Sequence, residues 1–280
     1  MLTTNPFADL AMSISPEIMQ GYVILMFLLV VVGTLIDVIH KKSAQYFFEN
    51  SQKQQSNARR TVGGGKKASA AIAVVLNEVL TSAEFANPQR RLSHLLTMYG
   101  FIIFVVSTVA LIFAYPTTAD AGIWGLLWHL GAASLAVGGY WFWFVIRVDV
   151  SAEGHKWYQL AKADLFIVSA LMMVTWGLIW SFSGGGLSGI YLLFFALFII
   201  SATILFSTVL WSKFAHMFFK PAAAFQKRMT KLDGSQENLP DVGEMNDPAI
   251  HARYPDIPEY MGKNPPNMGL GIKSEPPHHY

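Results

Sequence analysis

The chain has 280 residues, of which 53% are hydrophobic and 14% are charged, and it carries a net charge of +2 and no cysteine. This composition is too apolar for an ordinary soluble domain and indicates an integral membrane protein surrounded by lipid. The lack of cysteine excludes disulfides, thiol nucleophiles, cysteine-ligated iron–sulfur clusters and c-type haem attachment in this chain. Nucleic-acid binding has no support, because the basic residues flank apolar runs, which is their ordinary place in membrane proteins.

Five apolar runs follow one another along the chain, and each is long enough to cross a hydrocarbon core as a helix. They cover residues 18–39, 95–115, 123–146, 165–182 and 190–212. All 20 lysines and arginines lie in three segments, at residues 40–94, 147–164 and 213–280. The positive-inside rule places these segments in the cytoplasm and the N-terminus outside. The sequence therefore predicts an all-α membrane fold, a bundle of five transmembrane helices with a cytoplasmic C-terminus.

The same pattern predicts an N-terminal segment with the first helix, a cytoplasmic linker with an amphipathic helix, a four-helix membrane bundle and a proline-rich cytoplasmic tail. Their bounds are 1–40, 41–94, 95–216 and 217–280. Residues 41–68 of the linker are polar and contain a run of glycines, which predicts a flexible stretch. Residues 69–85 carry aliphatic side chains at helical spacing and predict the amphipathic helix. This helix would lie at the membrane interface or against a partner subunit.

Short turns join the second predicted helix to the third and the fourth to the fifth, so each pair is expected to form antiparallel neighbours. The third helix contains small residues that permit close approach of another helix, namely Gly131, Ala132, Ala133, Ala136, Gly138 and Gly139. The tail is rich in proline and poor in large aliphatic residues, so it cannot bury a core of its own. It is expected to be an extended arm on a soluble partner, or else a disordered tail.

Three histidines are candidate site residues. His94 lies at the cytoplasmic start of the second helix and His216 at the cytoplasmic end of the fifth, so the two share a similar membrane depth. Two imidazoles facing each other across a bundle can ligate a haem iron from both axial sides, or they can be interfacial residues that contact headgroups or a neighbouring subunit. His129 lies in the outer half of the third helix, where it would bind a quinone carbonyl, satisfy a backbone carbonyl of the fourth helix or lie at the outer interface.

Two acidic residues lie at the ends of predicted helices. Asp164 precedes the fourth helix, where the helix dipole favours a carboxylate. Asp37 is near the end of the first helix and is expected to pair with Lys41, four residues further on.

Three motifs resemble one known family. RLSHLLTMYGF at 91–101, KADLF at 162–166 and SKFAHMFFKP at 212–221 are similar to the second, fourth and fifth helices of the nitrate-reductase gamma-subunit-like membrane proteins. That family includes the membrane subunits of heterodisulfide reductase and of the quinone-interacting oxidoreductase complex. The resemblance covers about residues 18–230 and includes the order and layout of the helices.

The resemblance implies a non-catalytic subunit in the bacterial cytoplasmic (inner) membrane that links a cytoplasmic flavin and iron–sulfur oxidoreductase to quinone. It also implies that His94 and His216 are the axial ligands of haem b. Members with two haems have a second histidine deeper on each helix, and neither 95–115 nor 190–212 contains one, so one haem is expected. The quinone then binds nearer the inner face, or the chain is a cofactor-free anchor. A transporter is disfavoured, because no inverted repeat and no helix broken by proline at mid-membrane is evident.

Overall fold

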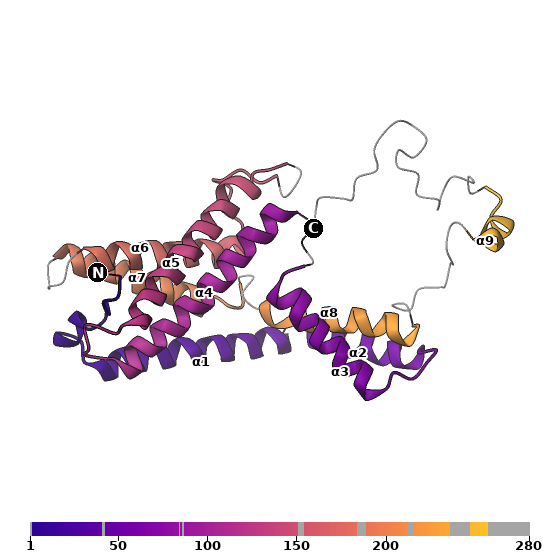
Figure 1. Ribbon diagram of the computed structural model, residues 1–280, viewed down its shortest axis with the longest axis horizontal. Coiled ribbons are helices and arrows are strands. Elements are labelled where there is room, and N and C mark those ends of the chain that lie inside the picture. The colour runs from indigo at the N-terminus through magenta and orange to yellow at the C-terminus, as the bar shows by residue number, and fades with distance from the viewer. Residues whose placement is uncertain are drawn as a thin grey trace.

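The computed structural model describes residues 2–40, 43–83, 85, 87–150, 154–183, 189–211, 216–235 and 247–256. In these segments the chain is helical apart from turns and one isolated β-bridge between Thr4 and Asp120 (Figure 1). Five helices are long and apolar enough to cross a membrane, which confirms the predicted fold class. The chain is therefore a multi-pass membrane protein by helix length and hydropathy. The orientation inferred from the basic residues stays a prediction.

The five spans begin and end close to the predicted apolar runs. They are α1 (Pro16–His40), α4 (Pro88–Ala114), α5 (Ile123–Trp141) with its π-helical extension η3 (Phe142–Ile146), α6 (Leu165–Phe182) after the 3-10 turn η4 (Lys162–Asp164), and α7 (Gly189–Ser207). The apolar run marks the part of each helix that faces hydrocarbon. The helix itself can extend beyond that run, because it ends where its terminal backbone groups find hydrogen-bond partners.

The start of α4 shows this difference most clearly. The helix begins about two turns before the apolar run, because the Asn87 side chain accepts hydrogen bonds from the backbone nitrogens of Gln89 (2.9 Å) and Arg90 (3.3 Å). Pro88 at the first helical position fits the same signal. His94 therefore lies in the second turn of α4, close to the helix start where the sequence predicts it.

The bundle is built from two helix pairs. α4 packs along α5, and α6 packs along α7, as the short turns predict, while α5 also contacts α6. α1 contacts α7 and α4 more sparsely and is the most exposed of the five spans. The small residues of α5 provide the close approach that the sequence predicts, since a Cβ added at Gly131 would lie 2.7 Å from the backbone nitrogen of Phe104.

A second group of helices lies at the end of the bundle where α1 ends (Figure 1). It consists of α2 (Ser43–Ser56), α3 (Gly64–Val74), the π-helical turn η2 (Val75–Leu80) and α8 (His216–Asp233), with α8 in contact with the other three. The expectation of a flexible stretch at 41–68 is wrong for most of its length, because α2 occupies 43–56 and α3 starts at Gly64. The glutamine-rich sequence of α2 has adequate helix propensity, and its packing on α8 adds to the stability of the helix.

Asp233 joins α2 to the end of α8. Its carboxylate accepts hydrogen bonds from Gln54 Nε2 (2.6 Å) and from the backbone nitrogen of Ser235 (2.9 Å). Burial raises the pKa of Asp233, but the hydrogen bonds from Ser235 and Gln54 outweigh it and hold that pKa below its ordinary value. The ionised carboxylate therefore stabilises this group of helices above the pKa of the unfolded chain, and the stabilisation is lost as the pH falls through the folded value.

The N-terminal segment closes the other end of the bundle, a feature that the hydropathy pattern does not indicate. Asn5 donates from its backbone to the Ala119 carbonyl (2.8 Å) and from Nδ2 to the Tyr115 carbonyl (2.7 Å). Phe7 inserts beside Trp128 and Trp180, with ring centroids 6.1 and 5.3 Å apart. The short helix η1 (Asp9–Met12) then leads into α1.

The predicted tail contains more helix near its start than expected. α8 extends to Asp233 through Pro221, and α9 (Pro248–Arg253) is a single short helix capped by Asp247. Residues 236–246 and 257–280 lie outside the described residues. The prediction of an extended arm or a disordered tail falls mostly on these residues and stays a prediction.

Candidate functional site

His94 is held by the segment that precedes α4. Its Nδ1 lies 3.0 Å from the hydroxyl of Ser82, which is fully buried, and its ring is 5.0 Å from the ring of Phe85. Ser82 has a φ of 46° in the left-handed region, which turns the chain after η2 back toward α4. The position of the imidazole is therefore fixed by a local turn that sequence periodicity does not reveal.

Two cationic side chains lie close to the Phe85 ring that packs on His94. The Phe85 ring has the Arg90 guanidinium 5.6 Å from its centroid and the Lys220 ammonium 5.0 Å from it. Arg91 Nε donates to the Thr81 carbonyl (2.7 Å), and this bond ties the turn to the first turn of α4. We call His94, Ser82, Phe85, Arg90 and Lys220 the His94 cluster.

His216 is the first residue of α8, and its side chain lies outside the part of the chain that the structure describes. Lys220 follows one helical turn later on the same helix and reaches Phe85. The start of α8 therefore lies near His94, but the predicted pairing of His94 with His216 stays a prediction.

His129 is buried in α5, with 3% of its surface exposed. Its Nδ1 donates to the Gly125 carbonyl (2.8 Å), and its Nε2 lies 3.2 Å from the Ser181 hydroxyl of α6. The rings of Trp128 and Phe182 pack on it at 4.9 and 5.4 Å. A quinone carbonyl that binds Nε2 would have to replace Ser181, so the predicted quinone role requires a local rearrangement.

The loop between η3 and η4 is organised by one buried arginine. Arg147 donates to the Asp164 carboxylate (2.6 Å) and to the Lys156 carbonyl (2.8 Å), and it also bonds the Gln159 carbonyl. Its guanidinium lies 4.3 Å above the ring of Trp143. Asp164 also accepts from the backbone nitrogen of Ala161 (2.9 Å), so the helix-start role predicted for this carboxylate is combined with an ion pair.

The loop presents large apolar side chains on its surface. Val150, Trp157 and Leu160 are 90%, 57% and 70% exposed, and Tyr158 is 58% exposed. His155, by contrast, is tied through its backbone nitrogen to the Arg147 carbonyl (3.0 Å). The second loop is therefore a segment whose base is fixed and whose apolar side chains point outward.

Asp37 near the end of α1 is buried, with 4% of its surface exposed. The predicted partner, Lys41, lies outside the described residues.

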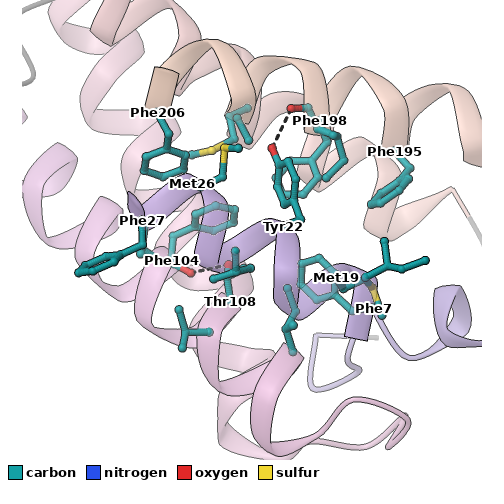
Figure 2. A pocket seen from close by; sticks show the side chains of 18 of the residues that line it. Phe7, Met19, Tyr22, Met26, Phe27, Phe104, Thr108, Phe195, Phe198 and Phe206 are labelled. Carbon is teal, nitrogen blue, oxygen red and sulfur yellow. Dashed lines mark hydrogen bonds between the residues drawn. The ribbon is translucent and has the colours of Figure 1, made fainter. Parts of the chain in front are cut away.

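A cavity of about 440 Å³ lies between α1, α4 and α7 (Figure 2). Its lining is almost wholly apolar and includes neither His94 nor His129. Among the residues that the structure describes, no group of three or more histidine, aspartate or glutamate side chains is placed to hold a metal ion. No pattern in the sequence indicates this cavity, because its walls are ordinary lipid-compatible residues.

Comparison of the chain with protein-family models, with curated proteins and with solved structures finds no match. The family resemblance of the three motifs therefore stays a prediction.

Proposed function

We propose that the chain is the membrane anchor and electron-transfer subunit of an oxidoreductase complex, docking a cytoplasmic flavin and iron–sulfur enzyme and linking it to the quinone pool. The end of the sequence, residues 267–280, together with the layout of the helices, resembles the membrane anchor subunit of adenylylsulfate reductase of sulfur-oxidising bacteria. The partner would then oxidise sulfite and AMP to adenylylsulfate and pass the electrons to this subunit. The chain itself would carry out no substrate chemistry.

The exposed apolar side chains of the second loop carry the docking proposal. A loop whose base is fixed by the bonds of Arg147 presents Trp157 and Leu160 in a defined place on the basic side of the bundle. Exposed apolar groups rimmed by polar residues are typical of protein interaction sites, and tryptophan is enriched among the residues that dominate their energetics.

The test uses full-length subunit co-expressed with the soluble enzyme. Replacing Trp157 and Leu160 together by serine is expected to weaken retention of the enzyme on washed membranes at least about tenfold. Truncating an interface anchor costs more than about 1 kcal/mol, and about 1.4 kcal/mol corresponds to a tenfold change. The measurement is the ratio of soluble enzyme to membrane subunit after washing.

Met12→Ser is the matched control, since Met12 is 77% exposed and lies in the N-terminal segment at the opposite end of the bundle. It should retain the enzyme as the unmodified chain does. Equal retention by the Trp157→Ser/Leu160→Ser variant would remove the loop from the docking face.

Haem b with His94 and His216 as axial ligands forms part of this proposal. The bond between His94 Nδ1 and Ser82 supports it, because metal-ligating histidines hold their other ring nitrogen in a hydrogen bond. Bound haem would carry single electrons between the partner and quinone. The cofactor-free anchor is the second candidate, and it is favoured by the packing of Phe85 directly on the His94 ring.

A reduced-minus-oxidised absorbance spectrum separates the two candidates. Protein expressed with haem supply and purified in mild detergent is expected to show a sharp b-type band that is stoichiometric with the chain. His94→Ala should abolish the band, whereas His155→Ala, in the exposed loop, should keep it. A flat spectrum from the unmodified protein would leave the cofactor-free anchor, and a band that survives His94→Ala would overturn the ligand assignment.

A further inference from the structure

The cavity between α1, α4 and α7 is a feature of the membrane bundle that the proposed function leaves unexplained. Figure 2 shows Tyr22, Met26 and Phe27 of α1 opposite Phe104 and Thr108 of α4, with the phenylalanines of α7 closing the far side. None of the site residues considered above lines it. Its occupant must therefore be inferred from its walls, its length and its opening.

The walls provide no hydrogen-bond donor for a polar ligand. Tyr22 Oη of α1 lies 3.2 Å from the Ile199 carbonyl and 2.9 Å from Thr203 Oγ1, both on α7. The Tyr22 hydroxyl proton is therefore used in a bond to α7. The Thr108 hydroxyl donates to the Phe104 carbonyl (2.7 Å) and accepts from Trp128 Nε1 (3.0 Å). A ligand with a polar ring, such as a quinone head, would lose its hydrogen bonds here, whereas hydrocarbon would lose nothing.

The cavity is elongated along the helices. Its lining runs on α1 from Ile18 to Val30, which at 1.5 Å per residue corresponds to about 18 Å. On the antiparallel α4 it runs from Phe101 to Ile112, a similar distance. One leaflet of a bilayer contributes about 15 Å of hydrocarbon, half of the roughly 30 Å core. The length of the cavity therefore matches that of one lipid acyl chain in one leaflet.

The cavity is continuous with the lipid-facing surface of the bundle. Three of its lining residues are also exposed on that surface: Ile18 and Phe27 of α1 at 65% and 68%, and Val109 of α4 at 40%. The opening therefore faces lipid between α1 and α4. At the end nearest the N-terminal segment the cavity is bordered by Phe7 and Ile14.

We propose that this cavity binds one acyl chain of a phospholipid from the leaflet that surrounds the N-terminal segment. The chain lies roughly parallel to the helices, and its headgroup remains in the bilayer interface. It fills the space that the sparse packing of α1 against α4 and α7 leaves open, and it restores dispersion contacts that an empty apolar cavity would forfeit. α1 is then joined to the bundle partly through lipid. This inference does not depend on the proposed redox function.

The first measurement uses the unmodified, full-length chain extracted in mild detergent and washed until bulk lipid is removed. Native mass spectrometry is expected to find one phospholipid retained per chain. Retention of no lipid would overturn the proposal. Retention of an isoprenoid quinone instead would overturn it as well and would assign the cavity to the quinone.

Two variants fill the cavity from opposite walls. Ala202→Phe enlarges a residue of α7 that lines the cavity and is 4% exposed, and Val23→Phe enlarges a lining residue of α1. Each is expected to reduce the retained phospholipid at least about tenfold, which corresponds to about 1.4 kcal/mol of binding. Two sites are used so that a folding defect at one leaves the other informative.

Ala196→Phe is the matched control, because Ala196 lies on the same helix as Ala202 but is exposed on its lipid-facing side. It should retain lipid as the unmodified chain does. Full retention by both cavity-filling variants, or equal loss in Ala196→Phe, would show that the retained lipid lies elsewhere on the bundle.

Discussion

Replacing Arg147 by alanine is expected to destabilise the folded chain by about 3 kcal/mol or more, since removing one partner of a buried ion pair leaves the other charge uncompensated. Arg147 is 1% exposed, and the carboxylate that it binds, Asp164, is 14% exposed. The substitution also orphans the carbonyls of Lys156 and Gln159 and removes the cation from the face of Trp143. Each loss adds to the same effect.

The measurement is thermal unfolding in detergent, followed by tryptophan fluorescence and by tryptic cleavage in the loop. A loss of about 3 kcal/mol corresponds to a fall of about 6–12 °C in the melting temperature. Arg147→Lys should recover only part of it, because an ammonium cannot make the several directed bonds of a guanidinium. In a double-mutant cycle, Asp164→Asn should cost much less in the Arg147→Ala background than alone. A melting temperature unchanged by Arg147→Ala would contradict the organising role of this side chain.

Only one half of this ion pair can be predicted from the sequence. The position of Asp164 predicts a carboxylate at the start of a helix, and the structure keeps that role through the Ala161 backbone. The partner lies 17 residues earlier in the chain, at the end of η3. Hydropathy places both ends of the loop at one membrane surface, but only the path of the loop brings one guanidinium over one carboxylate.

The five spans could be predicted because their signal is local and strong. An apolar run of sufficient length must be a helix in hydrocarbon, whatever packs against it. The insertion of Phe7 beside Trp128 and Trp180 has no such signal, since it depends on where distant segments meet. The helix α2 gives the opposite signal. Its polar composition suggests flexibility, whereas in the structure it is a helix that contacts α8, far along the sequence.

The candidate site was predictable only in part. The shared membrane depth of His94 and His216 marks His94 as a candidate, and the cost of an imidazole in hydrocarbon marks His129. In the structure, His94 contacts Ser82 and His129 contacts Ser181. Neither serine could be identified beforehand, because serine is common in turns and at helix surfaces.

Gly100→Ala is expected to be among the most damaging changes of a single methyl group at the contact of α4 with α5. A Cβ at this position would clash with the backbone nitrogen of Leu135 and would lie 2.9 Å from the Gly131 carbonyl. Both obstacles are backbone atoms of α5, so the clash is relieved only by moving the helices apart along their whole contact. Overpacking of a close-packed interior costs about 1–3 kcal/mol, and a clash with backbone belongs at the upper end.

Two other glycines provide graded controls. Gly139→Ala meets mainly the flexible end of Leu171, whose nearest carbon is 2.7 Å away, so a rotamer change relieves it and a smaller loss is expected. Gly21→Ala in α1 has no atom within 4 Å and should be neutral or slightly stabilising, because alanine favours helix over glycine. Melting temperatures measured in the same detergent should therefore fall in the order Gly21→Ala, Gly139→Ala, Gly100→Ala. If Gly100→Ala melted with Gly21→Ala, the spacing of α4 and α5 would not depend on the missing side chain, and the small-residue contact would lose its role in fixing the bundle.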